Sequence, residues 1–121
     1  MAILLDTHIF FWSVFEPEKL NKDETAAISD TNQKVLVSVV SLWELAIKKS
    51  IAKIELPSNF FQEINNSGFD ILGLSPVHIE QSMQLPLIHR DPFDRMLVAQ
   101  TKAENLSLLT RDKEIKKYFS E

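Results

Sequence analysis

Five carboxylates in this 121-residue chain stand where a parallel α/β sheet would place a ligand site. Asp6 directly follows the apolar run Ile3–Leu5, and Asp112 follows a later apolar run, while Glu44, Asp91 and Asp94 fall in the first turns of expected helices. Ligands of open α/β sheets bind at the carboxyl ends of the strands. Acids gathered at that edge would repel one another unless protonated or bridged by a cation, and a hard divalent cation is their natural partner.

Each acid also has a purely structural explanation. Asp6, Asp91 and Asp112 could each cap the helix that follows, because a short polar side chain can accept hydrogen bonds from free backbone N–H groups. The segment Ser41–Glu44 has the form S-x-x-E of a capping box, and Asp94 lies three residues after Asp91. Taken one at a time, these acids therefore do not establish a site.

Helix phase weakens the capping explanation for two of the acids. Glu44 lies between Trp43 and Leu45 in a segment that is apolar nearly all round, so its carboxylate should be partly buried and in need of a partner. Asp94 precedes an apolar stripe at i+3 and i+4, which places it above an inward-facing surface. Asp91 lies a turn earlier and should point more toward solvent.

Other polar side chains near these acids give softer evidence. Hydroxyl groups that could hold carboxylates or water, but that also suit ordinary turns and caps, belong to Thr7, Ser41 and Thr110. Guanidinium groups that could contact phosphate belong to Arg90, Arg95 and Arg111, with ion pairing to a neighbouring acid favoured for Arg95. His8 and His89 are possible ligands, although the supply of oxygen ligands makes this the minority interpretation.

The elements that must position these residues follow from the apolar pattern. Four short continuous runs indicate buried strands: Ile3–Leu5, Val35–Val39, Ile71–Leu74 and Leu106–Leu109. Helical segments are expected between and after them: Thr7–Val14, Asp23–Ser29, Ser41–Ile51, Pro57–Gly68, Pro76–Met83, Pro92–Glu104 with Asn105 as its stop, and a short basic helix from Asp112. This alternation predicts an α/β fold with a parallel sheet between helix layers.

Composition narrows the class of protein. The length predicts one domain, residues 1–121, and cysteine is absent, which excludes disulfides and thiolate metal sites. No apolar run approaches the ~18 residues of a membrane span, and no signal peptide is recognisable, so a cytoplasmic protein without a membrane partner is expected. The net charge of −4 argues against a broad basic surface for nucleic acid, unless cations lie among the acids.

Four segments in order resemble PIN domains, specifically the VapC-type toxins of bacterial toxin–antitoxin systems. The segments are Leu4–His8, Ser38–Glu44, His89–Arg95 and Leu109–Asp112. None is specific alone, but together they cover nearly the whole chain. The resemblance implies a three-layer α/β/α fold with a central parallel sheet of four to five strands, the fifth being in doubt because the chain stops soon after Tyr118.

The resemblance also implies an activity and a site. PIN domains are metal-dependent nucleases, and their acidic quartet corresponds here to Asp6, Glu44, Asp94 and Asp112, with Asp91 secondary. We expect Mg²⁺ or Mn²⁺ held first by Asp6, Asp94 and Glu44, with Asp112 completing the site. VapC-like toxins cleave RNA, usually form a homodimer and are silenced by a small antitoxin protein. The aromatic first helix, with the segment Phe10–Trp12, suits such a partner.

Three alternatives remain at the level of sequence. A signalling receiver domain shares the length and an Mg²⁺-binding acidic pocket, but it needs adjacent acids after the first strand and an Asp after the third, where this chain has Ser75. A haloacid-dehalogenase-like phosphatase needs D-x-D after the first strand, and position 8 is His8. A PIN fold that binds RNA or a partner without cleavage is the third.

Overall fold

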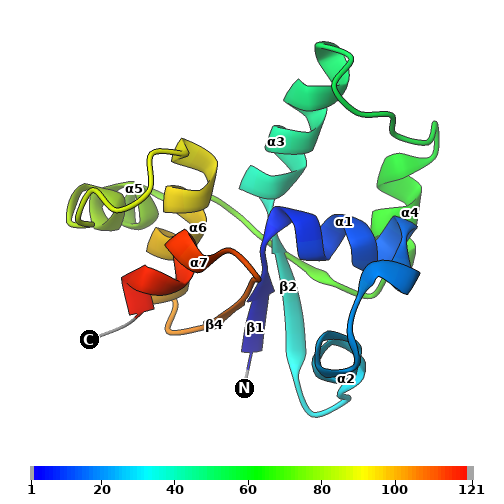
Figure 1. The fold of residues 1–121 in the computed structure, drawn as a ribbon, viewed down its shortest axis with the longest axis horizontal. Coiled ribbons are helices and arrows are strands. Elements are labelled where there is room, and N and C mark those ends of the chain that lie inside the picture. The colour runs from blue at the N-terminus through cyan, green and yellow to red at the C-terminus, as the bar shows by residue number, and fades with distance from the viewer. Residues whose placement is uncertain (1, 120–121) are drawn as a thin grey trace.

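The computed structural model describes residues 2–119 as four strands alternating with helices (Figure 1). The strands are β1 (Ala2–Leu5), β2 (Lys34–Ser38), β3 (Asp70–Leu72) and β4 (Ser107–Leu109). The helices are α1 (Thr7–Phe15), α2 (Lys22–Ser29), α3 (Val39–Ser50), α4 (Phe60–Asn66), α5 (Pro76–Met83), α6 (Pro92–Ala103) and α7 (Lys113–Lys116). Two 3-10 turns complete the described chain: η1 (Pro17–Lys19) and η2 (Lys117–Phe119).

The sheet is entirely parallel and has the order β3-β2-β1-β4. Leu5 at the end of β1 pairs with Val37 on one side and with Leu109 on the other, so these three strands end at the same edge. The residues that follow them are thereby brought together. A receiver domain has the order 2-1-3-4-5, so the strand order contradicts that alternative.

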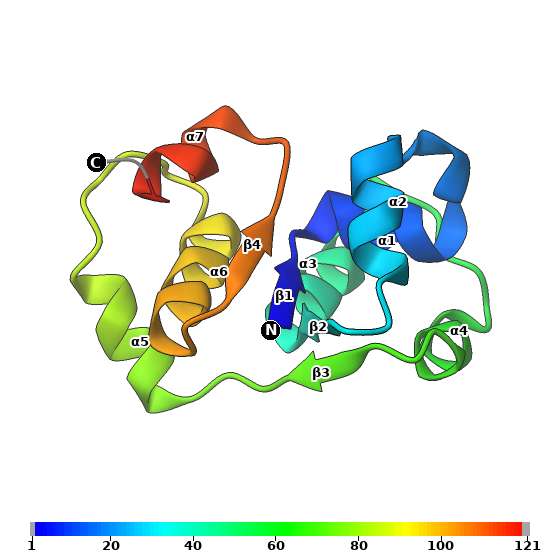
Figure 2. The ribbon, with the colours of Figure 1, turned by 90° about the horizontal axis from the view of Figure 1, so that it is seen from below.

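Helices cover both faces of the sheet, which confirms the predicted α/β class. Figure 2 shows α1, α2 and α4 on one side of the strands and α5, α6 and α7 on the other. The side chains of β1 alternate accordingly: Ile3 and Leu5 join the core under α1 and α4, whereas Leu4 packs with Leu97 of α6. No helix in residues 2–119 combines the length and apolar character needed to cross a membrane.

Several boundaries differ from the sequence prediction. Helix α3 begins at Val39 rather than Ser41, because Ser38 ends the strand and its Oγ accepts a hydrogen bond from the backbone N–H of Val40. Helix α4 begins at Phe60 rather than Pro57. The segment after α7 forms the turn η2, so the described residues contain no fifth strand, and residues 120 and 121 lie outside them.

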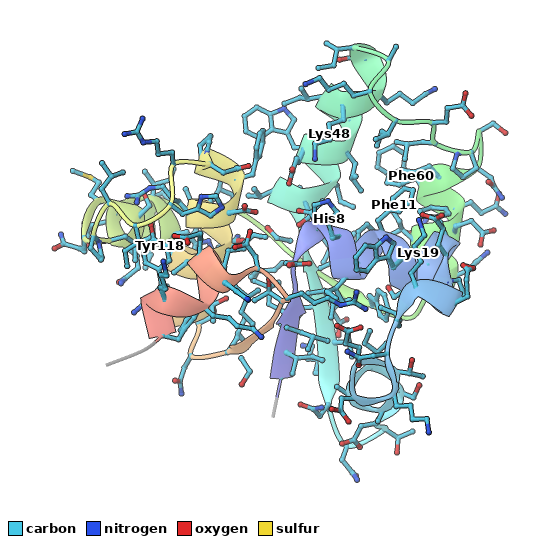
Figure 3. The ribbon with its side chains drawn as sticks, viewed as in Figure 1. His8, Phe11, Lys19, Lys48, Phe60 and Tyr118 are labelled. Atoms are coloured by element: carbon cyan, nitrogen blue, oxygen red, sulfur yellow. The ribbon has the colours of Figure 1, made fainter. Side chains whose placement is uncertain are left out.

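The aromatic side chains of α1 serve the core more than a free surface. Phe10 is fully buried, and Phe15 stacks on Phe60 of α4 with ring centroids 5.4 Å apart. Phe11 contacts Phe15 and, with Trp12, packs against the core cluster. Figure 3 shows Phe11 and Phe60 on the same side of the molecule. Only part of the expected partner surface on α1 is therefore available.

Candidate metal centre

Asp6 lies at the carboxyl end of the central strand and is almost completely buried. Its Oδ1 accepts a hydrogen bond from the backbone N–H of Ile9 at 2.8 Å, so Asp6 caps α1. Its Oδ2 accepts a hydrogen bond from the hydroxyl of Thr110, which follows β4. Burial raises the pKa of Asp6, the bonds from Thr110 and Ile9 oppose this, and the nearby charge of Asp112 adds to the rise. One carboxylate thus joins the ends of two strands.

Glu44 lies inside α3 and not at its first turn, so the predicted capping box at Ser41 is wrong. Because α3 starts earlier, Ser41 and Glu44 face α1, where the Thr7 hydroxyl lies 2.9 Å from Ser41 Oγ and 2.8 Å from Glu44 Oε1. The other carboxylate oxygen of Glu44 lies 2.9 Å from Lys48 Nζ. The expected burial of Glu44 is confirmed, and its partners are this hydroxyl and this ammonium group.

Asp94 and Asp91 both belong to the start of α6. Asp91 is the N-cap, and its Oδ1 accepts hydrogen bonds from the backbone N–H groups of Phe93 and Asp94. Asp94 Oδ2 lies 2.9 Å from His89 Nε2. Burial, reinforced by the charges of Asp91 and Glu44, raises the pKa of Asp94 to about 6, against the opposing effect of His89.

Asp112 caps α7 through Oδ1, which accepts hydrogen bonds from the backbone N–H groups of Glu114 and Ile115. Its other oxygen, Oδ2, lies 3.7 Å from His89 Nε2. Ligand atoms of His89, Asp94 and Asp112 all lie within 4.8 Å of one another. The imidazole of His89, expected only as a minority ligand, therefore lies with two acids in a grouping that could hold a metal ion.

One pocket of about 390 Å³ gathers the predicted acids. All five candidate carboxylates line it, together with His8, Lys48 and Arg111: they are Asp6, Glu44, Asp91, Asp94 and Asp112. Figure 3 shows Lys48 on α3 above His8 at the start of α1. Asp91, expected to point more toward solvent, is half-buried and belongs to the same wall. The five acids thus line one pocket, although of these only Asp94 and Asp112 belong, with His89, to the grouping within 4.8 Å.

The three candidate arginines have different surroundings. Arg90 is exposed and lines a separate pocket with Arg95. Arg95 donates to the carbonyl oxygen of Pro86 and to the hydroxyl of Tyr118, so the predicted ion pair of Arg95 with a neighbouring acid is wrong. Arg111 lines the acidic pocket, but its ion-pair partner is Glu24 of α2.

Two contributions to this site were missed from the sequence. Glu24 was not singled out, although the segment Asn21–Glu24 has the N-x-x-E form of a capping box and would have located it at the start of α2. Lys48 was also not singled out, although its spacing of four residues from Glu44 was the available signal for the observed ion pair.

The donor set suits a divalent cation. Carboxylate oxygens are the ligands preferred by Mg²⁺, and an imidazole beside them is also acceptable to Mn²⁺. Burial raises the pKa values of Asp6 and Asp94, and the hydrogen bonds and positive charges around them do not offset this effect. A bound cation would lower these pKa values, because it favours the ionised form of every carboxylate around it.

Comparison with known proteins agrees with this architecture. The PIN domain family model matches residues 3–119. Ribonuclease VapC22 of Mycobacterium tuberculosis (strain ATCC 25618 / H37Rv) is 24% identical over 120 residues, which cover 97% of this chain and 92% of that protein.

Two solved structures share the fold. The crystal structure of VapBC2 from Rickettsia felis bound to a DNA fragment from its promoter gives a TM-score of 0.75 at 18% identity, covering 97% of this chain and 92% of that one. FitAcB from Neisseria gonorrhoeae gives a TM-score of 0.64, also at 18% identity, covering 96% and 91%. Because the family model spans nearly all of the sequence, this protein belongs to the PIN domain family.

Proposed function

We propose that this chain is a divalent-metal-dependent endoribonuclease that hydrolyses RNA phosphodiester bonds, and that it is the toxin of a toxin–antitoxin pair. The observation that carries the proposal is the single pocket lined by Asp6 and Asp112, the N-caps of α1 and α7, and by Glu44 of α3 and Asp94 of α6. The name of the mycobacterial relative, a ribonuclease, supports RNA as the substrate. The chain would act as a single domain in the cytoplasm, where RNA is abundant.

The four acids of the quartet would hold Mg²⁺ or Mn²⁺. Such an ion, when bound, lowers the pKa of a coordinated water and stabilises charge that builds on the scissile phosphate. The protein supplies the arrangement: Thr110 fixes the carboxylate of Asp6 from one side, and Thr7 fixes that of Glu44 from another.

Two further groups would adjust the charge of the site. Lys48 offsets part of the negative charge on Glu44, with which it pairs at 2.9 Å. His89 contacts both Asp94 and Asp112, so it would orient these two carboxylates or join them as a ligand. Asp91 is a secondary candidate, because its Oδ1 is already committed to two backbone N–H groups at the start of α6.

Partners follow from the same proposal. A VapBC complex is among the similar structures, which supports a small antitoxin protein as a partner of this chain. A second, mostly apolar pocket of about 180 Å³ adjoins the acidic one and includes Phe11, Trp12, Leu45 and Ile54. We place the antitoxin contact there, since an apolar segment bound at this point would also obstruct the acids. A homodimer completes the proposed assembly.

The test is an RNA-cleavage assay on the purified chain with Mg²⁺ or Mn²⁺, with and without EDTA. Cleavage should require metal, and Asp6→Asn should lower the rate by about 100-fold or more, because a metal ligand contributes several kcal/mol to the transition state. Asn remains a good N-cap, so α1 should persist. The control is Asp70→Asn, since Asp70 is exposed at the amino end of β3, away from the site.

Two results would count against the proposal. Cleavage that persists in EDTA, or at full rate in Asp6→Asn, would remove the metal centre from the reaction. RNA binding without any cleavage in either metal would favour the alternative of a PIN fold that binds RNA or a partner without cutting.

A further inference from the structure

We propose that Arg111 binds a phosphate group of the RNA backbone next to the scissile one, and that Glu24, on the distant helix α2, is the residue that positions it. The inference rests on the proposed function, because its ligand is the RNA of that reaction. It adds a subsite for phosphate and a positioning residue that lies outside the four family-like segments.

The charges that line the pocket are the first step. Five carboxylates form its walls, and the permanently charged cations among its lining residues are Lys48 and Arg111. Lys48 is committed to Glu44 at 2.9 Å. An acidic pocket that receives a polyanion needs donors to phosphate at its rim as well as a metal, and Arg111 is the lining cation whose ion-pair partner lies outside the pocket.

The second step is that the ion-pair partner of Arg111 is Glu24, which does not line the pocket. Its Nε and Nη2 donate to the two carboxylate oxygens of Glu24, at 2.6 and 2.5 Å, and Nη2 also donates to the carbonyl oxygen of Lys19 at 2.7 Å. Its guanidinium carbon lies 4.7 Å from the ring centroid of Trp12, another lining residue. Three hydrogen bonds and an aromatic face therefore hold the guanidinium in one orientation.

The third step concerns the donors that remain. A guanidinium has five N–H groups in a fixed plane, and the bonds to Glu24 and Lys19 use three of them. Both N–H groups of Nη1 lack a protein acceptor within residues 2–119. The Arg111 side chain is 45% exposed, so these donors are accessible to a ligand. Arginine is well suited to phosphate because its planar donors match the phosphate oxygens.

Glu24 is the residue that holds the guanidinium of Arg111 in this orientation. It is the third residue of α2, where Oε1 also accepts the backbone N–H of Asn21, and its side chain is only 7% exposed. A buried carboxylate is costly without a partner, and its bond with Arg111 is the main cause of the lowered pKa of Glu24. The pair joins α2 to the loop before α7 across 87 residues of sequence, so neither end can move without breaking it.

The test is steady-state cleavage of a single-stranded RNA oligonucleotide in Mg²⁺ or Mn²⁺ by Glu24→Gln. The substitution is isosteric but replaces one of the two acceptors facing Arg111 by an NH₂ donor, so the guanidinium loses its fixed orientation. KM should rise about three- to tenfold, as for loss of a charge-assisted hydrogen bond, with kcat changed less than about twofold. Removal of a negative charge alone would instead lower KM for a polyanion, so the sign separates the two explanations.

A double-mutant cycle makes the positioning role specific. Arg111→Gln should raise KM at least as much as Glu24→Gln, and Glu24→Gln should cause no further rise in the Arg111→Gln background, because its effect passes through Arg111. Asp70→Asn is the matched charge control: it removes one exposed acid, 3.9 Å from Lys34, and should leave KM unchanged or lower.

The outcomes distinguish this inference from the proposed function. The proposed phosphate subsite is wrong if the KM of Glu24→Gln is at or below that of the wild type. It is also wrong if Glu24→Gln raises KM by the same factor in the Arg111→Gln background as in the wild type. In both cases the proposed nuclease activity of the wild type stands. Absence of metal-dependent cleavage by the wild type overturns both. If Glu24→Gln melts below the assay temperature, Arg111→Lys replaces it as the test. Lysine keeps the positive charge but lacks the planar set of N–H donors. KM therefore rises if the proposal is right and stays unchanged if only the charge matters.

Discussion

At the scale of single residues, capping and site formation involve different oxygen atoms of the same carboxylates. Asp6 and Asp112 each cap a helix through Oδ1 and turn Oδ2 toward the pocket or its neighbours, to Thr110 in one case and to His89 in the other. The backbone N–H groups therefore fix the orientation of the second oxygen. At the level of sequence, helix capping is an alternative to the metal-site interpretation. In the structure the two are compatible, because capping fixes the orientation in which these acids could bind a metal.

The acids of the site lower the free energy of unfolding of the metal-free protein at neutral pH. The pKa of Asp94 is about 6 in the folded chain against an ordinary value of 3.8, so the folded state binds this proton more tightly than the unfolded state. Its contribution to stability is complete below pH 3.8 and is lost as the pH rises to about 6. At neutral pH, Asp94 thus destabilises the metal-free fold.

Asp94→Asn should remove that penalty. In EDTA at pH 7, we expect the free energy of unfolding to rise by about 1 to 2 kcal/mol, less than the full pKa difference implies because the contact with His89 is weakened. At pH 3.5 the variant and the wild type should be nearly equal. Urea unfolding at both pH values measures this, with the exposed Asp70→Asn as control. A variant less stable than wild type at pH 7 contradicts the argument.

Most acids of the site could be predicted from the sequence because Asp6 and Asp112 follow strands and Asp91 and Asp94 begin a helix, and parallel strands bring such positions to one edge, whereas Glu44 lies inside α3. The partners of the charged groups could not. Glu24 and Arg111 are 87 residues apart, and nothing local distinguishes Arg111 from Arg90, which the fold leaves on a separate surface. Which basic side chain forms an ion pair with which acidic one depends on tertiary packing alone.

At the scale of elements, the ends of the two longest helices show the same arrangement with different residues. After α6, Asn105 adopts φ 56°, and Leu106 N–H donates to the carbonyl oxygen of Thr101. After α3, Ala52 adopts φ 57°, and Lys53 N–H donates to the carbonyl oxygen of Lys48. Both are Schellman motifs, in which a left-handed residue closes the helix. Both ends agree with the predicted helices to within one residue, but only asparagine tolerates this conformation well and signals it in the sequence, whereas alanine does not.

Ala52 is therefore a strained position. Ala52→Gly should raise the free energy of unfolding by about 0.5 to 1 kcal/mol, because glycine adopts positive φ without a clash of Cβ. The matched control is Ala46→Gly, at an exposed site within α3, which should lower the same quantity by about 1 kcal/mol. Thermal or urea unfolding of both variants gives opposite signs. A loss of stability in Ala52→Gly would contradict the assigned strain.

The start of α3 shows why one boundary was misplaced. The apolar run continues from β2 into Val39 and Val40, so the pattern does not mark where strand becomes helix. The boundary is fixed by Ser38, whose hydroxyl caps Val40 and donates to Gln100 of α6 at 2.6 Å. This long-range bond lies outside local sequence signals, and it moves Glu44 from a cap position into the wall of the pocket.

At the scale of the whole molecule, exposed apolar side chains mark surfaces for partners. Val77, Met83 and Leu87, on α5 and just after it, are 63%, 78% and 75% exposed. Figure 1 shows α5 at the opposite end of the molecule from α4, away from the apolar pocket at Phe11 and Trp12. Exposed large apolar side chains close together in the sequence are candidates for a protein interface. The proposed homodimer fits the α5 surface, which leaves the pocket beside the acids for the antitoxin.

Met83→Lys tests this assignment. Met83 is the last residue of α5, where a cation suits the helix dipole, so the fold should persist while a charge enters the centre of the proposed interface. We expect the dimer dissociation constant from sedimentation equilibrium to rise about tenfold or more, as for loss of an interface anchor. The matched control is Ile51→Lys, because Ile51 is 56% exposed at the end of α3, another helix terminus, and this change should leave dimerisation unaltered. An equal weakening of the dimer by both variants would show that added charge, and not the α5 surface, controls assembly. A wild type that sediments as a monomer would remove the homodimer from the proposal.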